Sequence, residues 1–504
     1  MVVNRPASGS RAIERLEFTF YNPAMNQDAR AGRRWLTVCS WLLLISLAVT
    51  GCSSSAPVNL PSIPLVTPPP EDEDARISRE FRREARKQVK FVSDPEVERY
   101  VDAMGRRILA VVGPQPFDYR YFVIDEPVLN AFAVPGGSIF IYAGLLDRVR
   151  SSDELAAVMA HETTHVAKRH MARMAGLDPI TILGLLGAVL AARSGASNAA
   201  AAAALGQGIS VARQIAYTRN LEMEADTLGL KYMTEAGYDP HGMVSFQKTM
   251  LQEQNLNPIG DVPPYLLDHP PTPERVANAE LLIRTMKTPV PPPVPPDIDP
   301  INKIHTLLRL ERREGDKIIA EQKRALSESP KSSEPYQLLG IVYFSQAMWQ
   351  EARQNLETAA KLNPSSPGID LDLGRVYTQI GDYDLARTAF DRAMARDPKE
   401  ALPYLYLGEL FEKQGDLRSA AGAYITAGNL APLWDKPPYR LSMVYGKLDR
   451  PGDGYYYRGR FFLLQDEDEK AAADFERAIK LLGANSPRGQ LIQDELKSLK
   501  ARKR

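Results

Sequence analysis

Two of the six histidines in the chain lie four residues apart, in the run His161-Glu162-Thr163-Thr164-His165. On a helix, residues i and i+4 project from the same face, so both imidazoles can bind one Zn²⁺ ion. Glu162 lies beside such a metal without needing to bind it. Its carboxylate can take a proton from the water that the metal activates and pass that proton to a leaving amine. The pattern therefore predicts metal-assisted hydrolysis of an amide bond.

A catalytic zinc ion needs a third protein ligand. The candidates in the chain are His170, Glu222, Glu224, Asp226, His241 and His269. His170 is too close on the same helix, and Lys168-Arg169-His170 is typical of a basic helix C-terminus. Residues 219–226 are helical by propensity, which places Glu222 and Asp226 on one face while Glu224 points elsewhere. One of these two carboxylates can bind zinc while the other orients a ligand histidine, and the residues alone leave both assignments open.

The elements that must position these residues are indicated by hydrophobic periodicity. Residues 76–92 and 95–112 are predicted helices, and residues 117–124 and 138–142 are predicted strands, the second entered through a Pro-Gly-Gly turn. Another helix then begins at Ser151, whose spacing from Glu154 is that of a capping box. An apolar stripe on this helix predicts that one of its faces packs in a core. We therefore expect a mainly helical α+β domain with a small β-sheet.

A 34-residue repeat begins after Pro300, where only helical patterns remain. Three series keep this spacing: Gly340, Gly374 and Gly408; Ala352, Ala386 and Ala420; Pro364, Pro398 and Pro432. This period is the tetratricopeptide signature, and such repeats stack into a solenoid that binds peptides or partner proteins. We predict an all-α repeat domain over residues 301–495. A Pro-rich linker over 287–300 would join it to a zinc metallopeptidase domain over 76–286.

The N-terminus has the layout of a secretory signal. Arg33-Arg34 precede an apolar run, residues 35–50, which is shorter than the roughly 20 residues of a membrane-spanning helix. Cys52 follows Thr-Gly, which resembles a bacterial lipobox, and Ser53 after it favours the outer membrane. We therefore expect a signal peptide over 1–52, a lipid on Cys52 and a disordered tether over 53–75. The protein would be periplasmic and anchored to the outer membrane by its lipid.

Composition excludes two classes of site. The chain has two cysteines, of which Cys39 would be removed and Cys52 would carry lipid, so a thiolate zinc site or a cysteine nucleophile is excluded. Lys+Arg and Asp+Glu both count 62, so charge gives no sign of a nucleic-acid partner. Residues 177–208, rich in Gly, Ala, Ile and Leu, are expected to form a helical hairpin that is buried, lies over the cleft or touches the membrane.

Four motifs in order give residues 80–285 a family resemblance. They are the His161–His165 run, the helix with Glu222 and Asp226, the segment 130–137 and the segment 269–275. Together they resemble the gluzincin-type zinc peptidases that include the CAAX prenyl proteases and the bacterial heat-shock protease HtpX. The resemblance implies one Zn²⁺ per chain, with Glu222 as the third ligand and Asp226 orienting a ligand histidine.

With the lipobox and the repeats added, the layout is similar to that of BepA-like periplasmic proteases. This resemblance implies that His269 is an extra zinc ligand that occludes the site until substrate displaces it. Alternatively, His269 or Arg275 steadies the tetrahedral oxyanion. Asn130 and the strand containing Ser138 and Phe140 are expected either to bind substrate backbone by strand addition or to have a packing role only.

Three functions are consistent with these observations. The first is an endopeptidase for misassembled outer-membrane proteins, whose repeats bind substrate or the outer-membrane barrel assembly machinery. The second is a chaperone-like scaffold with a latent zinc site. The third is processing of a prenylated or lipid-linked substrate within a membrane, which the shortage of spanning helices disfavours.

Overall fold

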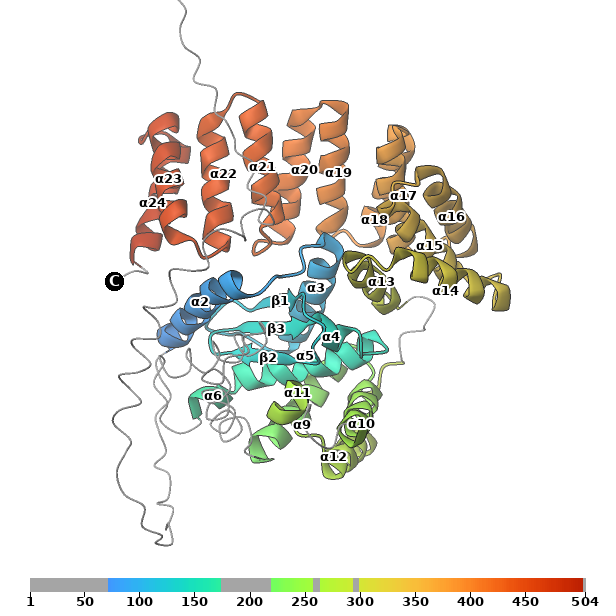
Figure 1. Ribbon diagram of the computed structural model, residues 1–504. Coiled ribbons are helices and arrows are strands. Elements are labelled where there is room, and N and C mark those ends of the chain that lie inside the picture. Colours follow the sequence, from blue (N-terminus) through green and yellow to red (C-terminus); the bar gives the residue numbers. More distant parts are fainter. Residues whose placement is uncertain (1–70, 174–218, 257–262, 293–298, 502–504) are drawn as a thin grey trace, which may run out of the picture. The chain divides into compact units, whose positions relative to one another are not determined.

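The computed structural model describes residues 71–173, 219–256, 263–292 and 299–501 (Figure 1). The predicted signal peptide with Cys52, most of the predicted tether and the apolar segment 177–208 lie outside these residues. The described residues all belong to one compact unit of the chain. None of the described helices is long and apolar enough to cross a membrane.

The sheet of the N-terminal half has three strands, β1 (Arg120–Ile124), β2 (Ala131–Val134) and β3 (Ser138–Tyr142). Their order is β1-β3-β2, and β3 runs parallel to β1 and antiparallel to β2. The turn between β2 and β3 has Gly136 and Gly137 at φ 86° and 93°, a conformation that glycine adopts at little cost. The central strand β3 is therefore paired along both edges.

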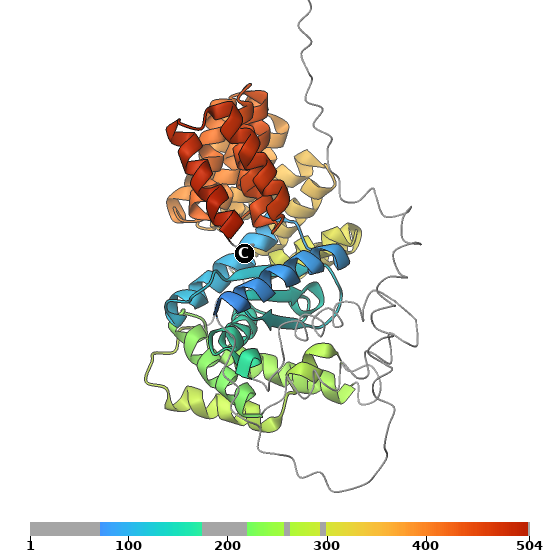
Figure 2. The same ribbon diagram turned by 90° about the vertical axis from the view of Figure 1, so that its left-hand side faces the viewer.

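Helices cover both faces of this sheet (Figures 1 and 2). Successive residues of a strand face opposite sides, and all five residues of β3 are buried. Phe140 and Tyr142 pack against α2 (Glu71–Gln88), whereas Ile139 and Ile141 belong to the core around α3 (Pro95–Val112) and α5 (Ser152–Ala167). Helix α2 begins at Glu71, so residues 71–75 of the expected tether are helical instead.

Helix α5, which carries the His161–His165 run, is capped from two parts of the chain. The Ser151 hydroxyl accepts the backbone N–H of Glu154 at 3.2 Å, as predicted, but the Glu154 carboxylate accepts from Arg150 rather than from the cap residue. Asp299, which precedes the repeats, accepts the N–H groups of Ser152 at 2.8 Å and Ile301 at 3.0 Å. One carboxylate therefore joins the start of α5 to the first repeat helix.

Six further helices lie among the described residues of the N-terminal half. They are α4 (Ala143–Leu146), α6 (His170–Arg173), α9 (Arg219–Glu235), α10 (His241–Leu256), α11 (Pro264–Asp268) and α12 (Pro273–Thr285). Of these, α9 packs along α5, while α10 lies between α5 and α12. The α5–α9 pair is the platform on which the site described below is built.

The C-terminal half is helical throughout its described residues. Its helices are α13 (Ile301–Glu311), α14 (Gly315–Glu328), α15 (Ser333–Ser345), α16 (Trp349–Leu362), α17 (Pro367–Ile380), α18 (Tyr383–Arg396), α19 (Leu402–Gln414), α20 (Leu417–Leu430), α21 (Lys436–Lys447), α22 (Pro451–Leu464), α23 (Asp468–Leu482) and α24 (Pro487–Ala501). The expected combination of an α+β domain with an all-α repeat region is confirmed. Helix α21 lies in sequence between the α19–α20 pair and the α22–α23 pair.

One contact explains the 34-residue period. In four helix pairs, a glycine of the first helix lies against the side chain sixteen residues on: Gly340 and Leu356, Gly374 and Phe390, Gly408 and Tyr424, Gly459 and Phe475. A Cβ on any of these glycines would approach that side chain within 2.3 to 2.6 Å. Only glycine allows the two helices to pack this closely, so the glycine spacing is the spacing of the helix crossings.

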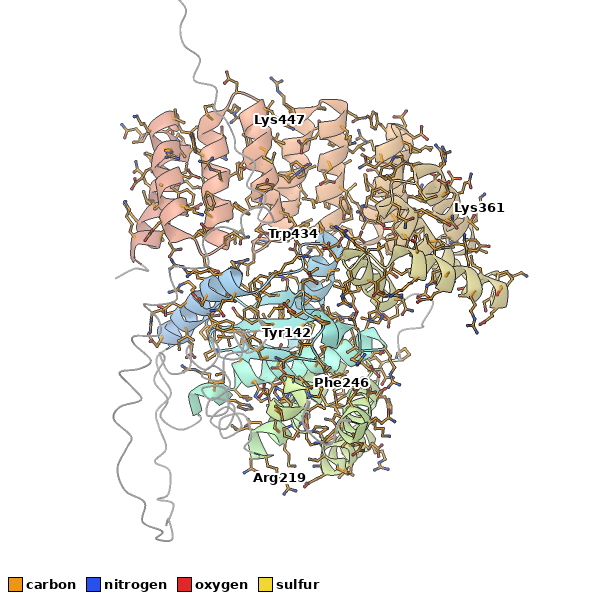
Figure 3. All side chains as sticks on the ribbon, in the orientation of Figure 1. Tyr142, Arg219, Phe246, Lys361, Trp434 and Lys447 are labelled. Atoms are coloured by element: carbon orange, nitrogen blue, oxygen red, sulfur yellow. The ribbon has the colours of Figure 1, made fainter. Side chains whose placement is uncertain are left out.

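Buried ion pairs join the two halves. On α2, Arg82 donates two hydrogen bonds to the carboxylate of Asp466, at 2.7 and 2.5 Å, and the two side chains are only 7% and 5% exposed. Arg120 of β1 lies 3.5 Å from the same carboxylate. Trp434, labelled in Figure 3, donates its indole N–H to Glu98 of α3 at 2.9 Å. The repeats are therefore held against α2, α3 and β1 by charges removed from water.

We expect Asp466→Ala to lower the melting temperature by several degrees. Removing one partner of a buried pair leaves an uncompensated charge and costs about 3–5 kcal/mol, here for the Arg82 guanidinium. The control is Asp494→Ala, whose carboxylate is 79% exposed and lies 3.6 Å from Lys497, a type of pair that contributes little to stability. Thermal unfolding followed by circular dichroism measures both, and equal melting temperatures for the two variants would contradict the expectation.

Candidate metal centre

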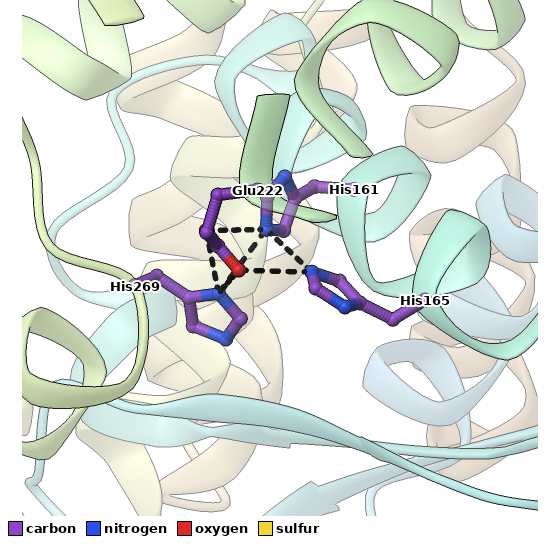
Figure 4. Close-up of side chains that lie close together, drawn as sticks. All are labelled: His161, His165, Glu222 and His269. Carbon is purple, nitrogen blue, oxygen red and sulfur yellow. Dashed lines mark hydrogen bonds and ion pairs between the residues drawn. The ribbon is translucent and has the colours of Figure 1, made fainter. Parts of the chain in front are cut away.

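Four side chains from three parts of the N-terminal half converge on one point (Figure 4). His161 and His165 come from α5, Glu222 comes from α9, and His269 directly follows α11. One ligand atom from each of them lies within 4.8 Å of all the others. Three imidazole nitrogens and a carboxylate at this spacing can hold one metal ion.

The inward nitrogen atoms of the three histidines lie close to one another and to the Glu222 carboxylate. His161 Nε2 lies 3.0 Å from His165 Nε2 and 3.1 Å from His269 Nδ1. The Glu222 carboxylate lies 3.4 Å from His161 Nε2 and 3.3 Å from His165 Nε2, and 3.2 Å from His269 Nδ1. A neutral imidazole has one N–H and one lone pair, so three nitrogens turned inward bring lone pairs together. A cation between them relieves this repulsion.

The outward nitrogen of His161 is held by a second layer of contacts. His161 Nδ1 lies 3.1 Å from Asp226, which sits one helical turn after Glu222 on α9. Arg275 of α12 binds Asp226 through two hydrogen bonds of 2.6 and 2.7 Å and also lies 3.1 Å from Glu222. An N–H directed at Asp226 leaves the Nε2 lone pair of His161 directed at the cluster, which is the tautomer that binds a metal.

The charges of the cluster favour a cation at its centre. Burial opposes protonation of His161, but the carboxylates of Glu222 and Asp226 outweigh burial and raise the pKa of His161 to about 10. Burial would raise the pKa of Asp226, but Arg275 lowers it to about 2. The pKa of Glu222 is also well below its ordinary value because the charges of His269 and His161 outweigh burial. Either a proton or a metal ion can supply the positive charge that these carboxylates attract.

Glu162 lies at the edge of the cluster. Its side chain is buried, and its Oε1 atom lies 3.3 Å from His269 Nε2 without forming a hydrogen bond to any described residue. A buried carboxylate oxygen that lacks a hydrogen bond is uncommon in folded proteins. Its free lone pairs make Glu162 available to accept a proton from a molecule bound in the cluster.

The structure separates the six candidates for the third ligand. Glu222 and His269 lie in the cluster, whereas Asp226 contacts the outward side of His161. His241 lies elsewhere, with a side chain 63% exposed and paired to Asp239. Of the two carboxylates on one face of α9, Glu222 is therefore the one whose oxygens point at the other ligand atoms.

The prediction that His170 is part of a basic helix C-terminus is wrong. Helix α5 ends at Ala167, Arg169 adopts a left-handed φ of 50°, and His170 begins the separate helix α6. His170 is fully buried, and its Nδ1 lies 3.1 Å from Nδ1 of His165. Helical spacing could not reveal this contact, because the turn at Arg169 breaks the helix before His170.

Of the two roles expected for Ser138 and Phe140, the structure supports packing rather than substrate binding. Phe140 is fully buried among other aromatic rings, and its ring centroid lies 5.1 Å from those of both Phe122 and Phe132. The Ser138 hydroxyl is buried and accepts a hydrogen bond from Arg82 at 2.9 Å. Strand addition at β3 is also impossible because both of its edges are already paired. The alternation of residues 138–142 predicted the strand correctly but could not show that it is central.

Asn130, the other predicted substrate-binding residue, has a different environment. It immediately precedes the edge strand β2 and is fully buried, yet neither atom of its side-chain amide has a hydrogen-bond partner in the described part of the chain. A buried amide without a hydrogen-bond partner is uncommon in folded proteins.

Comparison with known proteins agrees with this geometry. Residues 95–283 match the family described as Peptidase family M48, and residues 343–407 match the tetratricopeptide repeat family. The resemblance inferred from the ordered motifs is thereby confirmed. All the clustered ligands, Glu162, Asp226 and Arg275 lie within the first matched region.

Several known proteins are similar to part of this chain. The Escherichia coli beta-barrel assembly-enhancing protease is 32% identical over 205 residues, which are 40% of this chain and 41% of the relative. Its counterpart in Vibrio cholerae is 34% identical over 203 residues, 40% of this chain and 42% of the relative. The mitochondrial metalloendopeptidase OMA1 of Schizosaccharomyces pombe is 30% identical over 182 residues, 36% of this chain and 51% of the relative. The chain thus spans less than half the length of the bacterial relatives.

Metal binding to the cluster should strengthen as pH rises. Because the pKa of His161 is raised to about 10, the imidazole holds a proton at neutral pH in the metal-free protein, and a metal must displace it. We expect the affinity for Zn²⁺ to rise about tenfold per pH unit between pH 6 and 8 for each proton displaced. Competition with a chelator measures the Zn²⁺ affinity at each pH. His241→Gln is the control and should show the same dependence of affinity on pH. An affinity independent of pH would contradict this expectation.

Proposed function

We propose that this chain, in which a peptidase family M48 domain precedes tetratricopeptide repeats, is a zinc-dependent endopeptidase that hydrolyses peptide bonds of protein substrates. The observation that carries the proposal is the convergence of His161, His165, Glu222 and His269 beside the buried carboxylate of Glu162. The M48 match and the metalloendopeptidase names of the relatives support it.

The donor set suits one Zn²⁺ ion per chain. Imidazole nitrogens and a carboxylate oxygen are ordinary zinc ligands, and the inward nitrogens of His165 and His269 lie 3.0 and 3.1 Å from that of His161. His161, His165 and Glu222 would hold the ion. A bound zinc ion would lower the pKa of a water molecule and polarise the scissile carbonyl.

Glu162 is the proposed general base. Its Oε1 atom makes no hydrogen bond with a described residue, and it lies 3.3 Å from His269 in the ligand cluster. It can therefore accept a proton from the attacking water and then donate that proton to the amine of the departing peptide. Asp226 acts indirectly, because its carboxylate is fixed by Arg275 and in turn fixes the ring of His161.

His269 is the proposed latch of the site. A catalytic zinc site keeps one position open, whereas a site with four protein ligands is closed. His269 Nδ1 lies among the other ligand atoms, 3.1 Å from His161 Nε2, and so would fill the open position. The backbone N–H of His269 donates to the carbonyl of Tyr265 at 2.8 Å, and the Tyr265 ring packs 4.9 Å from the imidazole. Substrate would have to displace this ring before Glu162 could act.

Asn130 is the proposed contact for substrate backbone. Its amide lacks a partner in the described residues, and it adjoins β2, which is an edge strand of the described sheet. A peptide lying along an edge strand can pair with its free backbone groups. This assigns to the edge strand β2 the role that the sequence analysis gave to β3.

The names of the bacterial relatives motivate a narrower proposal about substrate and place. Because they are called beta-barrel assembly-enhancing proteases, we propose that the substrates include misassembled outer-membrane proteins. The repeats would bind these substrates or the barrel assembly machinery. A lipid on Cys52 would hold the protein at the periplasmic side of the outer membrane.

A chaperone-like scaffold is the second candidate function. The four-donor cluster favours it, because a closed zinc site hydrolyses nothing until one ligand leaves. In that case the repeats would be the functional part and the cluster a latent or stabilising site. The two functions differ in whether Glu162 is needed.

Glu162→Gln should retain zinc and abolish cleavage. The amide keeps the size of the side chain but cannot accept the proton, and loss of a general base commonly slows a reaction about 10²- to 10⁴-fold. We would measure zinc content and casein hydrolysis of the purified protein, with Glu280→Gln on the surface of α12 as the matched control. A wild-type protein without bound metal would refute the proposed function. Equal hydrolysis by wild type and Glu162→Gln would refute the role of Glu162.

His269→Ala should raise the basal rate of casein hydrolysis several-fold while weakening zinc binding. Removal of the fourth donor opens the position that substrate needs. The control is His241→Ala, which removes an exposed histidine outside the cluster and should leave both quantities unchanged. A lower rate in His269→Ala would instead favour the oxyanion role, and an unchanged rate would eliminate the latch.

A further inference from the structure

A histidine that is not a ligand lies directly behind one that is. His165 directs Nε2 at the cluster, where it lies 3.0 Å from His161 Nε2 and 3.3 Å from Glu222. Its other nitrogen, Nδ1, lies 3.1 Å from Nδ1 of His170. The two rings meet edge to face, with centroids 4.9 Å apart and planes at 90°. His170 therefore contacts the side of His165 that faces away from the metal position.

The chain places His170 there by an unusual turn. Arg169 adopts a left-handed φ of 50°, which is uncommon for a residue other than glycine. Its guanidinium binds the carboxylate of Asp74 on α2, with Nε and Nη2 each 2.7 Å from Oδ2. This pair anchors the turn to a separate helix. The ring of His170 is fully buried.

A carboxylate lies on the far side of His170. Glu224 Oε2 is 3.4 Å from His170 Nε2, so its negative charge favours a proton on that nitrogen. Glu224 and Glu222 are two residues apart on α9 and so project from different sides of the helix. Glu222 contacts the inward side of His165, while Glu224 reaches the histidine behind it. One helix thus supplies a carboxylate at each end of the His165–His170 pair.

The contacts define a consistent arrangement of protons. For His165 to direct a lone pair from Nε2 at a metal, its Nδ1 must carry the proton and needs an acceptor. His170 Nδ1 is that acceptor when the proton of His170 is on Nε2, the nitrogen that faces Glu224. His161 satisfies the same requirement differently, because its Nδ1 faces Asp226 directly.

We propose that His170 and Glu224 are positioning residues that hold the ring and tautomer of His165 so that Nε2 faces the metal. This inference rests on the proposed zinc site. It assigns a function to a histidine and a carboxylate that make no direct contribution to the cluster. The acceptor at His170 Nδ1, rather than the bulk of the ring, is what His165 requires.

Two substitutions distinguish the effect of the hydrogen-bond acceptor at His170 Nδ1 from the effect of the volume of the His170 ring. His170→Leu fills the buried space without an acceptor, whereas His170→Asn places an amide oxygen near the position of Nδ1. Loss of a partner that orients a metal ligand commonly weakens metal binding about 10- to 100-fold. We expect this loss for His170→Leu and recovery to within about threefold of wild type for His170→Asn. Glu224→Ala, which removes a partly exposed side chain, should weaken binding about threefold.

Zinc affinity by chelator competition and the visible absorption spectrum of the Co²⁺-substituted full-length protein are the two readouts. The spectrum reports ligand geometry, so it should change in His170→Leu and return towards wild type in His170→Asn. His241→Leu is the matched control and should alter neither readout. Unfolding of the metal-free variants, followed by circular dichroism, shows whether each one folds.

The possible outcomes are distinct. Equal losses of affinity in His170→Leu and His170→Asn, or wild-type affinity and spectra in both, would overturn the proposal and leave the zinc site intact. If His170→Leu does not fold, His170→Asn and Glu224→Ala decide. The proposal is supported if His170→Asn has the wild-type spectrum and only Glu224→Ala loses about threefold in zinc affinity. It is overturned if the zinc affinity of Glu224→Ala is unchanged. A wild-type protein that binds neither metal refutes the proposed function itself.

Discussion

The close packing of α9 against α5 is the constraint on which the site depends. A Cβ at Gly229 of α9 would lie 3.1 Å from the backbone nitrogen of His161, so the helices meet almost backbone to backbone. Asp226 and Glu222 lie one and two turns before this contact, on the same face of α9. Their carboxylates consequently meet the two nitrogens of the His161 ring. A larger separation of the helices would remove Glu222 from the ligand set and Asp226 from the ring it orients.

This packing buries several charges, which are tolerated only because each has a partner of opposite sign. An isolated buried carboxylate is costly, but Arg275 contacts both Asp226 and Glu222. The remaining negative charge is directed at the inward histidine nitrogens. The folded protein therefore attracts a cation to this position. When the cation is a proton, the attraction appears as the raised pKa of His161.

The repeats are attached to the same framework. Asp299 binds the N-termini of both α5 and α13, and residues of α13 such as Ile304 and Leu308 share a core with α5. The Arg82–Asp466 pair adds a second attachment, and Arg82 also contacts Ser138 of the central strand. The repeats and the helix that carries His161 and His165 are therefore joined by buried contacts, because Asp299 caps that helix.

Local periodicity alone determined the helix of His161 and His165, the strand 138–142, the carboxylate face of α9 and the repeat whose glycines meet Leu356, Phe390 and Tyr424. Each of these features depends on the spacing of residues near one another in sequence. The regular geometry of a helix or a strand then fixes which of their side chains share a face. Tertiary structure decided that β3 is central and that His170 lies behind His165. It also decided between Glu222 and Asp226, which residue spacing had left open and which only the family resemblance had assigned. These depend on strand order, on the approach of α9 to α5 and on a left-handed turn at Arg169, which arise from contacts between residues distant in sequence and leave no mark in local spacing.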